Sequence, residues 1–184
     1  MKQSVDAKLR SFRCALFLIA VVFAVSTPAI PALAAARAGE CSKNPANREF
    51  DFWLGNWAVT YPSATSGATS TVSLDLGQCL IVESWNGGEG HSGKNMLAYS
   101  VDDKSWHGMF ADNQGRVHVF AGKVAAGVAE FQGPSVGRDG ETVLNRIKVV
   151  RKTPDKVEQL WEQSTDNGAN WKTVFQGEYS RRKS

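Results

Sequence analysis

The feature that most constrains the fold is a regular series of short segments rich in Val, Phe, Trp, Tyr and Thr, separated by turn residues. Ten such segments follow residue 55, and each has the length and composition of a β-strand. They are Asn56–Tyr61, Ser70–Leu76, Cys79–Trp85, Asn95–Val101, Trp106–Ala111, Arg116–Val124, Val128–Gln132, Thr142–Arg151, Val157–Gln163 and Trp171–Ser180. The connections leave no room for crossover helices, so neighbouring strands are expected to run antiparallel in an all-β fold.

The lengths of the connections favour a barrel over a sandwich. The longer ones cover residues 62–69, 86–93, 133–141 and 164–170, with a tighter one at 112–115. Between them fall the short ones at 77–78, 102–105, 125–127 and 152–156. Alternate loops of an up-and-down meander lie at the same end, which gives an open rim and a closed base. An even number of strands also brings the last beside the first. We predict an antiparallel up-and-down barrel of about ten strands.

A cluster of aromatic residues precedes the first strand, in the stretch FDFWLGNWAV. Phe50, Trp53, Leu54 and Trp57 follow the i, i+3, i+4, i+7 spacing of one apolar helix face. Upstream, Asn44 suits the N-cap of a helix and is followed by proline at the first helical position. We predict a short helix that plugs the closed base, with Trp57 in the floor of the barrel.

The first 34 residues have the three parts of a secretory signal. A basic start is followed by an apolar run of 12 residues, Cys14–Val25, and then by small residues with an A-x-A pattern. The run is too short for a membrane span, which needs about 20 apolar residues. We predict a cleaved signal peptide over residues 1–34 and a single barrel domain over residues 35–184, periplasmic or secreted and without a stable membrane span.

Removal of that segment neutralises the chain. Residues 1–34 hold four of the 21 Lys and Arg and one of the 18 Asp and Glu, which leaves 17 of each. A neutral chain has no general attraction to nucleic acid or to an anionic membrane. We therefore expect neither as a partner.

Two cysteines remain after that removal, Cys41 and Cys79. In an oxidising compartment an even pair is expected to form a disulfide, and the alternative is two free buried thiols. Cys41 precedes the predicted plug and Cys79 follows the turn at 77–78, so both are expected at the closed base.

Several stretches resemble a known superfamily. Gly55-Asn56-Trp57 resembles the G-x-W that opens the first strand of lipocalins and related calycin barrels. In that superfamily an arginine of the last strand commonly packs over the tryptophan, which the resemblance assigns to Arg181 or Arg182. FDFWLGNW, GQCLIVESW, QLWEQSTDNGANW and FQGEYSRR resemble a group of exported bacterial calycin-like proteins. This resemblance implies a fold and brings no reaction with it.

Polar residues within the apolar strands mark a candidate site. Glu83 shares the parity of Ile81 and Trp85, and Gln159 shares that of Trp161. Asn145 is a further polar residue on an apolar face. If these faces point inward, the barrel holds an aromatic cavity with a few polar groups, as ligand sites do. The alternative is a filled core or solvent-facing side chains. The predicted ligand-binding residues are Glu83, Trp85, Tyr99, Phe110, Gln159 and Trp161.

The stretch STDNGANW, residues 164–171, resembles the Asp-box of sialidase-like propellers, where the motif recurs once per blade. Here the full pattern occurs once. Its chemistry is that of a hairpin turn, in which Asp166 accepts amide hydrogen bonds, Gly168 takes a positive φ and Trp171 packs under the loop. We expect a structural role.

The three histidines, His91, His107 and His118, show no tight metal-ligand spacing. His107 and His118 flank one connection. A two-residue turn would place them about 7–8 Å apart on one face, and a three-residue loop would place them on opposite faces. Haem-binding relatives among small ten-stranded barrels use a late histidine, and none follows His118. No metal and no cofactor is predicted.

No catalytic residue is predicted either. GHSGK, residues 90–94, departs from the G-x-S-x-G elbow at its last position, and Glu158 and Glu162 share a strand face without forming a dyad. The first functional hypothesis is an exported barrel that binds a small, mostly apolar molecule. The alternatives are an isomerase or hydrolase that acts on a lipophilic substrate through Glu83 and a histidine, or an envelope interaction or structural protein with a filled barrel.

Overall fold

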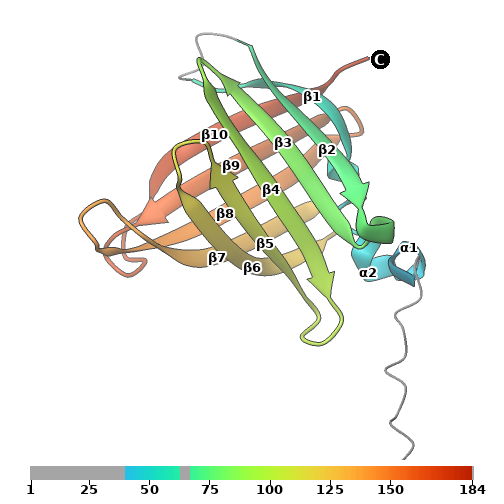
Figure 1. The fold of residues 1–184 in the computed structure, drawn as a ribbon, viewed down its shortest axis with the longest axis horizontal. Helices are drawn as coiled ribbons and strands as arrows, with labels where there is room; N and C mark the ends of the chain where they lie inside the picture. Colours follow the sequence, from blue (N-terminus) through green and yellow to red (C-terminus); the bar gives the residue numbers. More distant parts are fainter. Residues whose placement is uncertain (1–39, 63–66, 184) are drawn as a thin grey trace, which may run out of the picture. The chain divides into compact units, whose positions relative to one another are not determined.

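The computed structural model describes residues 40–62 and 67–183, so the predicted signal peptide lies outside the described residues. Ten antiparallel strands form one closed barrel, in which each strand pairs with its neighbours in sequence and β1 pairs with β10 (Figure 1). The strands are β1 (Gly55–Thr60), β2 (Ala68–Asp75), β3 (Leu80–Gly88), β4 (His91–Ser100), β5 (Ser105–Asp112), β6 (Val117–Ala125), β7 (Val128–Val136), β8 (Thr142–Thr153), β9 (Lys156–Ser164) and β10 (Lys172–Arg181). The predicted all-β, up-and-down barrel is confirmed.

The barrel closes through β1 and β10, where Trp57 lies opposite Arg181 and Val59 lies opposite Tyr179. Side chains of these strands alternate between buried and exposed positions, as the period of two requires. One end of the barrel, here called the base, carries the β2–β3, β4–β5, β6–β7 and β8–β9 connections. The opposite end is called the rim.

Short helical turns precede β1, namely α1 (Glu40–Lys43), α2 (Pro45–Arg48) and a 3₁₀ turn, η1 (Asp51–Trp53). Asn44 caps α2 as predicted, because its Oδ1 accepts a hydrogen bond from the N–H of Ala46 at 3.1 Å. The predicted helical face is wrong in detail. The chain is already extended at Leu54, with ψ of 139°, and Trp57 belongs to β1. Gly55, with φ of 132°, carries the chain from the 3₁₀ turn into the strand.

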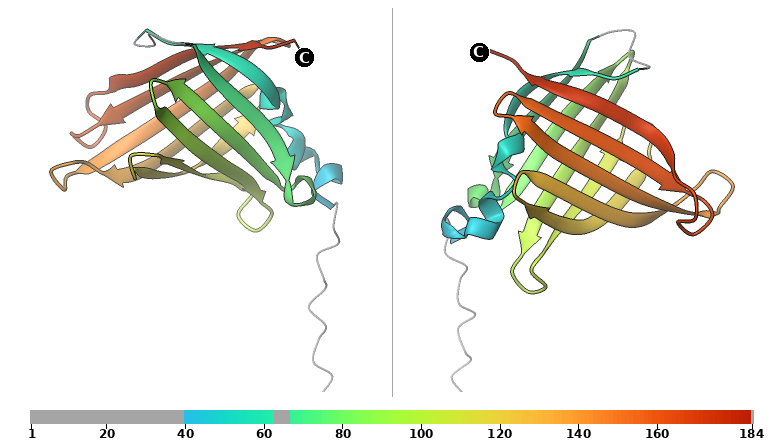
Figure 2. Two further views of the ribbon diagram at one scale, coloured as in Figure 1. Left: turned by 45° about the horizontal axis from the view of Figure 1, so that its top comes forward. Right: turned by 180° about the vertical axis from the view of Figure 1, so that it is seen from behind.

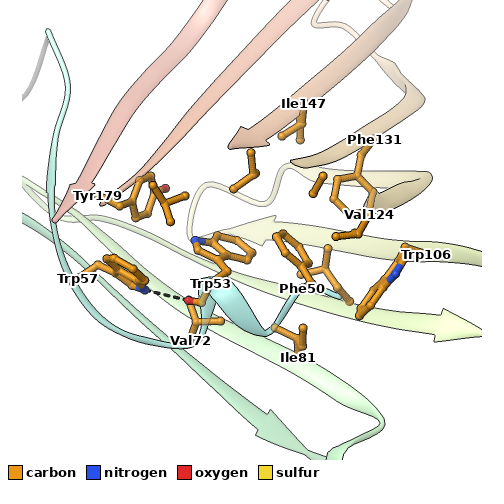
Figure 3. Close-up of a cluster of buried hydrophobic side chains, with 14 of the residues drawn as sticks. Phe50, Trp53, Trp57, Val72, Ile81, Trp106, Val124, Phe131, Ile147 and Tyr179 are labelled. Atoms are coloured by element: carbon orange, nitrogen blue, oxygen red, sulfur yellow. Dashed lines mark hydrogen bonds between the residues drawn. The ribbon is translucent and has the colours of Figure 1, made fainter. Parts of the chain in front are cut away.

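The aromatic side chains before β1 fill the base of the barrel (Figure 3). Phe50 and Trp53 are fully buried, with ring centroids 5.0 Å apart. Phe50 also contacts Trp106 of β5 at 5.8 Å, and Trp53 contacts Tyr179 of β10 at 6.4 Å. The indole N–H of Trp57 donates to the carbonyl of Trp53 at 2.9 Å. The segment therefore acts as a plug that joins opposite walls of the barrel.

Arg181 fastens this plug from the last strand. Its guanidinium carbon lies 4.3 Å from the centroid of the Trp57 ring, and its Nη1 donates to the carbonyl of Leu54 at 2.9 Å. Its Nη2 and Nε donate to the carbonyl of Pro154 at 3.2 and 3.3 Å. Arg182 contributes through its backbone, since its N–H donates to the carbonyl of Asn56 at 2.8 Å.

The predicted disulfide is confirmed at the base. Cys41 of α1 is bonded to Cys79, 38 residues later, with the two Cα atoms 5.0 Å apart. The guanidinium of Arg48 adds hydrogen bonds to the side chain and the carbonyl of Gln78. Together they tie α1 and α2 to the turn η2 (Leu76–Gln78) between β2 and β3, beside which the two helices lie in Figure 2.

The predicted long rim loop at residues 86–93 is wrong. β3 extends to Gly88 and β4 begins at His91, so the connection is a two-residue hairpin turn. Glu89 and Gly90 both have positive φ, at 50° and 79°, as a type I′ turn requires. The glycines of this segment supply a tight turn instead of a long loop.

Candidate functional site

A cavity of about 310 Å³ occupies the rim half of the barrel, above the plug. It is lined by inward-facing residues of seven strands, from β3 to β6 and from β8 to β10. Five of the six predicted ligand-binding residues line it, namely Glu83, Trp85, Phe110, Gln159 and Trp161.

Tyr99 is the exception. It packs against Trp106 at 6.0 Å in the base half of the barrel and does not line the cavity. Its parity on β4 matches that of Asn95, which does line the cavity. The two are four positions apart, or about 13 Å at 3.3 Å per residue. The odd or even position of a residue along a strand predicts whether its side chain faces inward, but not how far along the barrel axis it lies.

Four aromatic side chains form the walls of the cavity: Trp85, Phe110, Trp161 and Phe175, here called the aromatic collar. Consecutive rings meet edge to face. The centroid distances are 6.3 Å from Phe175 to Trp85, 6.5 Å from Trp85 to Phe110 and 5.9 Å from Phe110 to Trp161. Such contacts hold the rings in place around the cavity.

Glycines keep the collar against the wall and the cavity open. A methyl group at Gly87 would collide with the ring of Trp85, one at Gly93 with Phe110, and one at Gly177 with Phe175. The aromatic rings occupy the space that a side chain at each of these glycine positions would need. Three of the four collar rings therefore occupy space beside a glycine that any larger side chain would fill.

Glu83 lies deep in the cavity and is only 4% exposed. Its Oε1 accepts a hydrogen bond from Ser70 Oγ at 2.7 Å, and Asn95 lies directly opposite it on β4. Burial raises the pKa of Glu83 to about 7, against the opposing effect of hydrogen bonds from Ser70 and Asn95. No ion pair to Glu83 occurs among the described residues.

Tyr179 and Gln159 lie at the same depth. The hydroxyl of Tyr179 donates to Oε1 of Gln159 at 2.7 Å. Burial, with the nearby charge of Glu83, raises the pKa of Tyr179 well above its ordinary value, so the phenol stays neutral. Tyr179 also packs on Trp53, and it therefore separates the cavity from the plug.

His118 faces the cavity from β6, and its ring stands on Trp161 with centroids 4.8 Å apart. Burial lowers its pKa, Arg116 lowers it further, and Asp112 acts in the opposite direction. Its Nδ1 is buried without a hydrogen-bond partner among the described residues. Nearer the rim, Arg116 Nε donates to Asp112 at 2.7 Å.

Asn145 shares the inward face of β8 with Ile147, but it is fully buried and does not line the cavity. Its Oδ1 accepts hydrogen bonds from the indole of Trp161 at 3.0 Å and from Gln163 at 2.9 Å. Its amide nitrogen donates to Ser135 Oγ at 2.9 Å. Asn145 is thus a satisfied core residue that orients Trp161.

Sequence reasoning missed Asn95, His118 and Phe175 as cavity residues. Phe175 shares the parity of Tyr179 on β10, which was an available signal. For His118 the sequence offers no comparable signal, because the length of the connection to β5 leaves its face open. The structure places His107 and His118 on opposite faces of the barrel wall. His107 faces outward and contacts Asp103 at 2.7 Å.

No group of three metal-ligating side chains occurs in the described part of the chain.

The Asp-box-like stretch forms the β9–β10 hairpin turn. Asp166 accepts hydrogen bonds from Ser164 Oγ at 2.7 Å and from the backbone N–H of Asn170 at 2.8 Å. Gly168 has a φ of 90°, and its carbonyl accepts from the indole of Trp171 at 3.0 Å. Every predicted element of the turn chemistry is present.

No protein-family model matches this chain, and no curated protein matches it significantly. Over residues 40–62 and 67–183, no helix has the length and apolar character needed to cross a membrane.

Proposed function

We propose that this barrel binds a small, mostly apolar molecule in the cavity of its rim half. The observation that carries the proposal is the combination of an aromatic collar with a few buried polar groups in a preformed space of about 310 Å³. Ligand pockets in proteins have this composition and begin at about this size. The fold is consistent with a lipocalin-like barrel, which is the resemblance that the sequence suggested.

Export is part of this proposal. The Cys41–Cys79 disulfide supports it, because such bonds persist in oxidising compartments such as the periplasm. A structural protein with a filled barrel is less well supported, since the rim half holds an open cavity.

A catalytic role is the second candidate. Glu83 has a pKa of about 7, close to the value that suits a general acid or base, and His118 lines the same cavity. This candidate requires that a bound molecule be chemically changed, whereas binding alone requires only that it be retained.

Native mass spectrometry of the exported protein tests the proposal. We expect one small-molecule adduct per chain under native conditions, which is released when the protein unfolds. Chemical identification of the released molecule before and after prolonged incubation separates retention from turnover. A chain that carries no adduct and takes up no member of a library of small lipophilic molecules would contradict the proposal.

A further inference from the structure

Glu83 is a buried carboxylate to which the described residues offer no cationic partner. Its described hydrogen-bonding neighbours, Ser70 and Asn95, are both neutral, and no Lys, Arg or His among the described residues forms an ion pair with it. A buried carboxylate is costly unless a charge or several donors compensate it. The cavity is the open side from which compensation can come.

Two further acceptor atoms in the cavity have no donor in the described part of the chain. Asn95 is 9% exposed, and its Oδ1 is buried without a partner among the described residues. Because the Asn95 side chain bonds to the Glu83 carboxylate, its amide nitrogen must face that carboxylate, and its oxygen is the atom left over. His118 Nδ1 is likewise unpartnered, and at neutral pH it can accept a hydrogen bond. The deep half of the cavity therefore offers acceptors to a ligand that carries donors.

The aromatic collar also favours a positively charged ligand, as the carboxylate of Glu83 does. Aromatic faces carry negative potential, and tryptophan attracts cations most strongly. Two of the four collar rings are tryptophans, Trp85 and Trp161. The other charged groups are farther toward the rim, where Arg116 is paired with Asp112. His91 also lies there, bonded to Gln114.

We propose that the cavity selects a small amine on an apolar body, with the ammonium group bound by Glu83 and Asn95 and the apolar body held in the aromatic collar. The inference rests on the proposed function and specifies its ligand class. A protonated primary amine has three N–H donors, which can serve the carboxylate of Glu83 and the amide oxygen of Asn95 together. A carboxylate or phosphate group would be repelled by the negative charge of Glu83, and in its ionised form it has no N–H or O–H to donate to these acceptors.

The amine class implies a pH dependence of defined sign. Glu83 must be ionised to pair with an ammonium, and its pKa is about 7. Affinity is expected to rise from pH 5 to pH 8 and to fall about tenfold for each pH unit below 7. Protonation of His118 at low pH acts in the same direction, because a second cation would face the ligand. Tyr179 stays neutral throughout this range.

Three probes with one apolar body test the inference: 2-phenylethylamine, 2-phenylethanol and 3-phenylpropanoate, each titrated calorimetrically into the disulfide-bonded protein. At pH 8 we expect the amine to bind at least tenfold more tightly than the alcohol, and the carboxylate to bind most weakly. Glu83→Gln should abolish the amine preference and spare the alcohol. Glu130→Gln is the matched control, because Glu130 lies outside the barrel in an exposed pair with Lys148, and it should change nothing.

The outcomes separate this inference from the function on which it rests. Equal binding of amine and alcohol, preference for the carboxylate, or an amine affinity that does not rise between pH 5 and pH 8 would overturn the amine assignment and leave ligand binding intact. Failure of all three probes and of neutral lipophilic dyes to bind would remove the binding function itself. The wild-type comparison and pH profile decide the question even if Glu83→Gln does not fold.

Discussion

Among single residues, Glu83 links the stability of the barrel to pH. Burial raises its pKa from 4.5 to about 7. Between these values the folded protein keeps a proton that the unfolded chain has lost. The free energy of unfolding therefore falls as the pH rises from 4.5 to 7, and this contribution is constant outside that window. A shift of this size corresponds to about 3 kcal/mol.

We therefore predict that Glu83→Gln stabilises the unliganded protein at pH 8 much more than at pH 5. Urea unfolding of both proteins at the two pH values measures the difference. Identical pH dependence in the variant and the wild type would show that Glu83 is not the buried titrating group.

Gly55 is the second residue for which the structure predicts a defined change in stability on substitution. It has a φ of 132°, and a methyl group on it would collide with the Arg181 guanidinium that fastens the plug. Gly55→Ala is predicted to lower the free energy of unfolding by about 1–3 kcal/mol through backbone strain alone, with any loss of the Arg181 contacts in addition. Gly67→Ala is the control, since a methyl group there meets no neighbour within residues 40–62 and 67–183. Equal urea midpoints for the two variants would contradict this account of the G-x-W segment.

Among the elements, the β9–β10 hairpin depends on one exposed carboxylate. Hydrogen bonds from the Asn170 backbone and the Ser164 hydroxyl hold the pKa of Asp166 at about 2, below its ordinary 3.8. The stabilisation by Asp166 is complete above 3.8 and is lost as the pH falls through 2. The melting temperatures of wild type and Asp166→Asn should therefore differ at pH 5 and converge near pH 2. Asp139→Asn, in another exposed turn, is the control and should have the melting temperature of the wild type at both pH values. A difference in melting temperature between Asp166→Asn and the wild type that is the same at pH 5 and pH 2 would refute the mechanism.

The strands were predictable from sequence because their side chains alternate and turn residues separate them. Alternation and turn residues did not predict the type of a turn, the position of a side chain along the barrel axis, or the register between two strands. Glycine-rich composition at residues 86–93 did not distinguish a long loop from a type I′ turn, because both use positive φ. Parity placed Tyr99 on the correct face but at the wrong depth. The register of β5 and β6, which places His107 and His118 on opposite faces, follows from a turn length that the sequence left open.

For the molecule as a whole, the sequence could not decide whether the barrel is filled or hollow. That property depends on pairs such as Phe110 and Gly93, which belong to different strands and meet only through the β4–β5 register. The base is filled because the aromatic plug enters it, and the rim half is open because glycines accept the collar rings. The division of one barrel into a packed floor and a cavity is the central structural claim.

Binding of a neutral lipophilic dye, N-phenyl-1-naphthylamine, to wild type and to Gly177→Ala tests that claim most directly. A methyl group at Gly177 would collide with the ring of Phe175, which lines the cavity, and we expect the ring to shift into that space. Fluorescence titration should show one saturable site in the wild type, about tenfold weaker or absent in Gly177→Ala, and unchanged in Gly67→Ala. Non-saturable binding in the wild type, or equal affinity in a folded Gly177→Ala protein, would contradict the assignment of the rim-half cavity as the binding site.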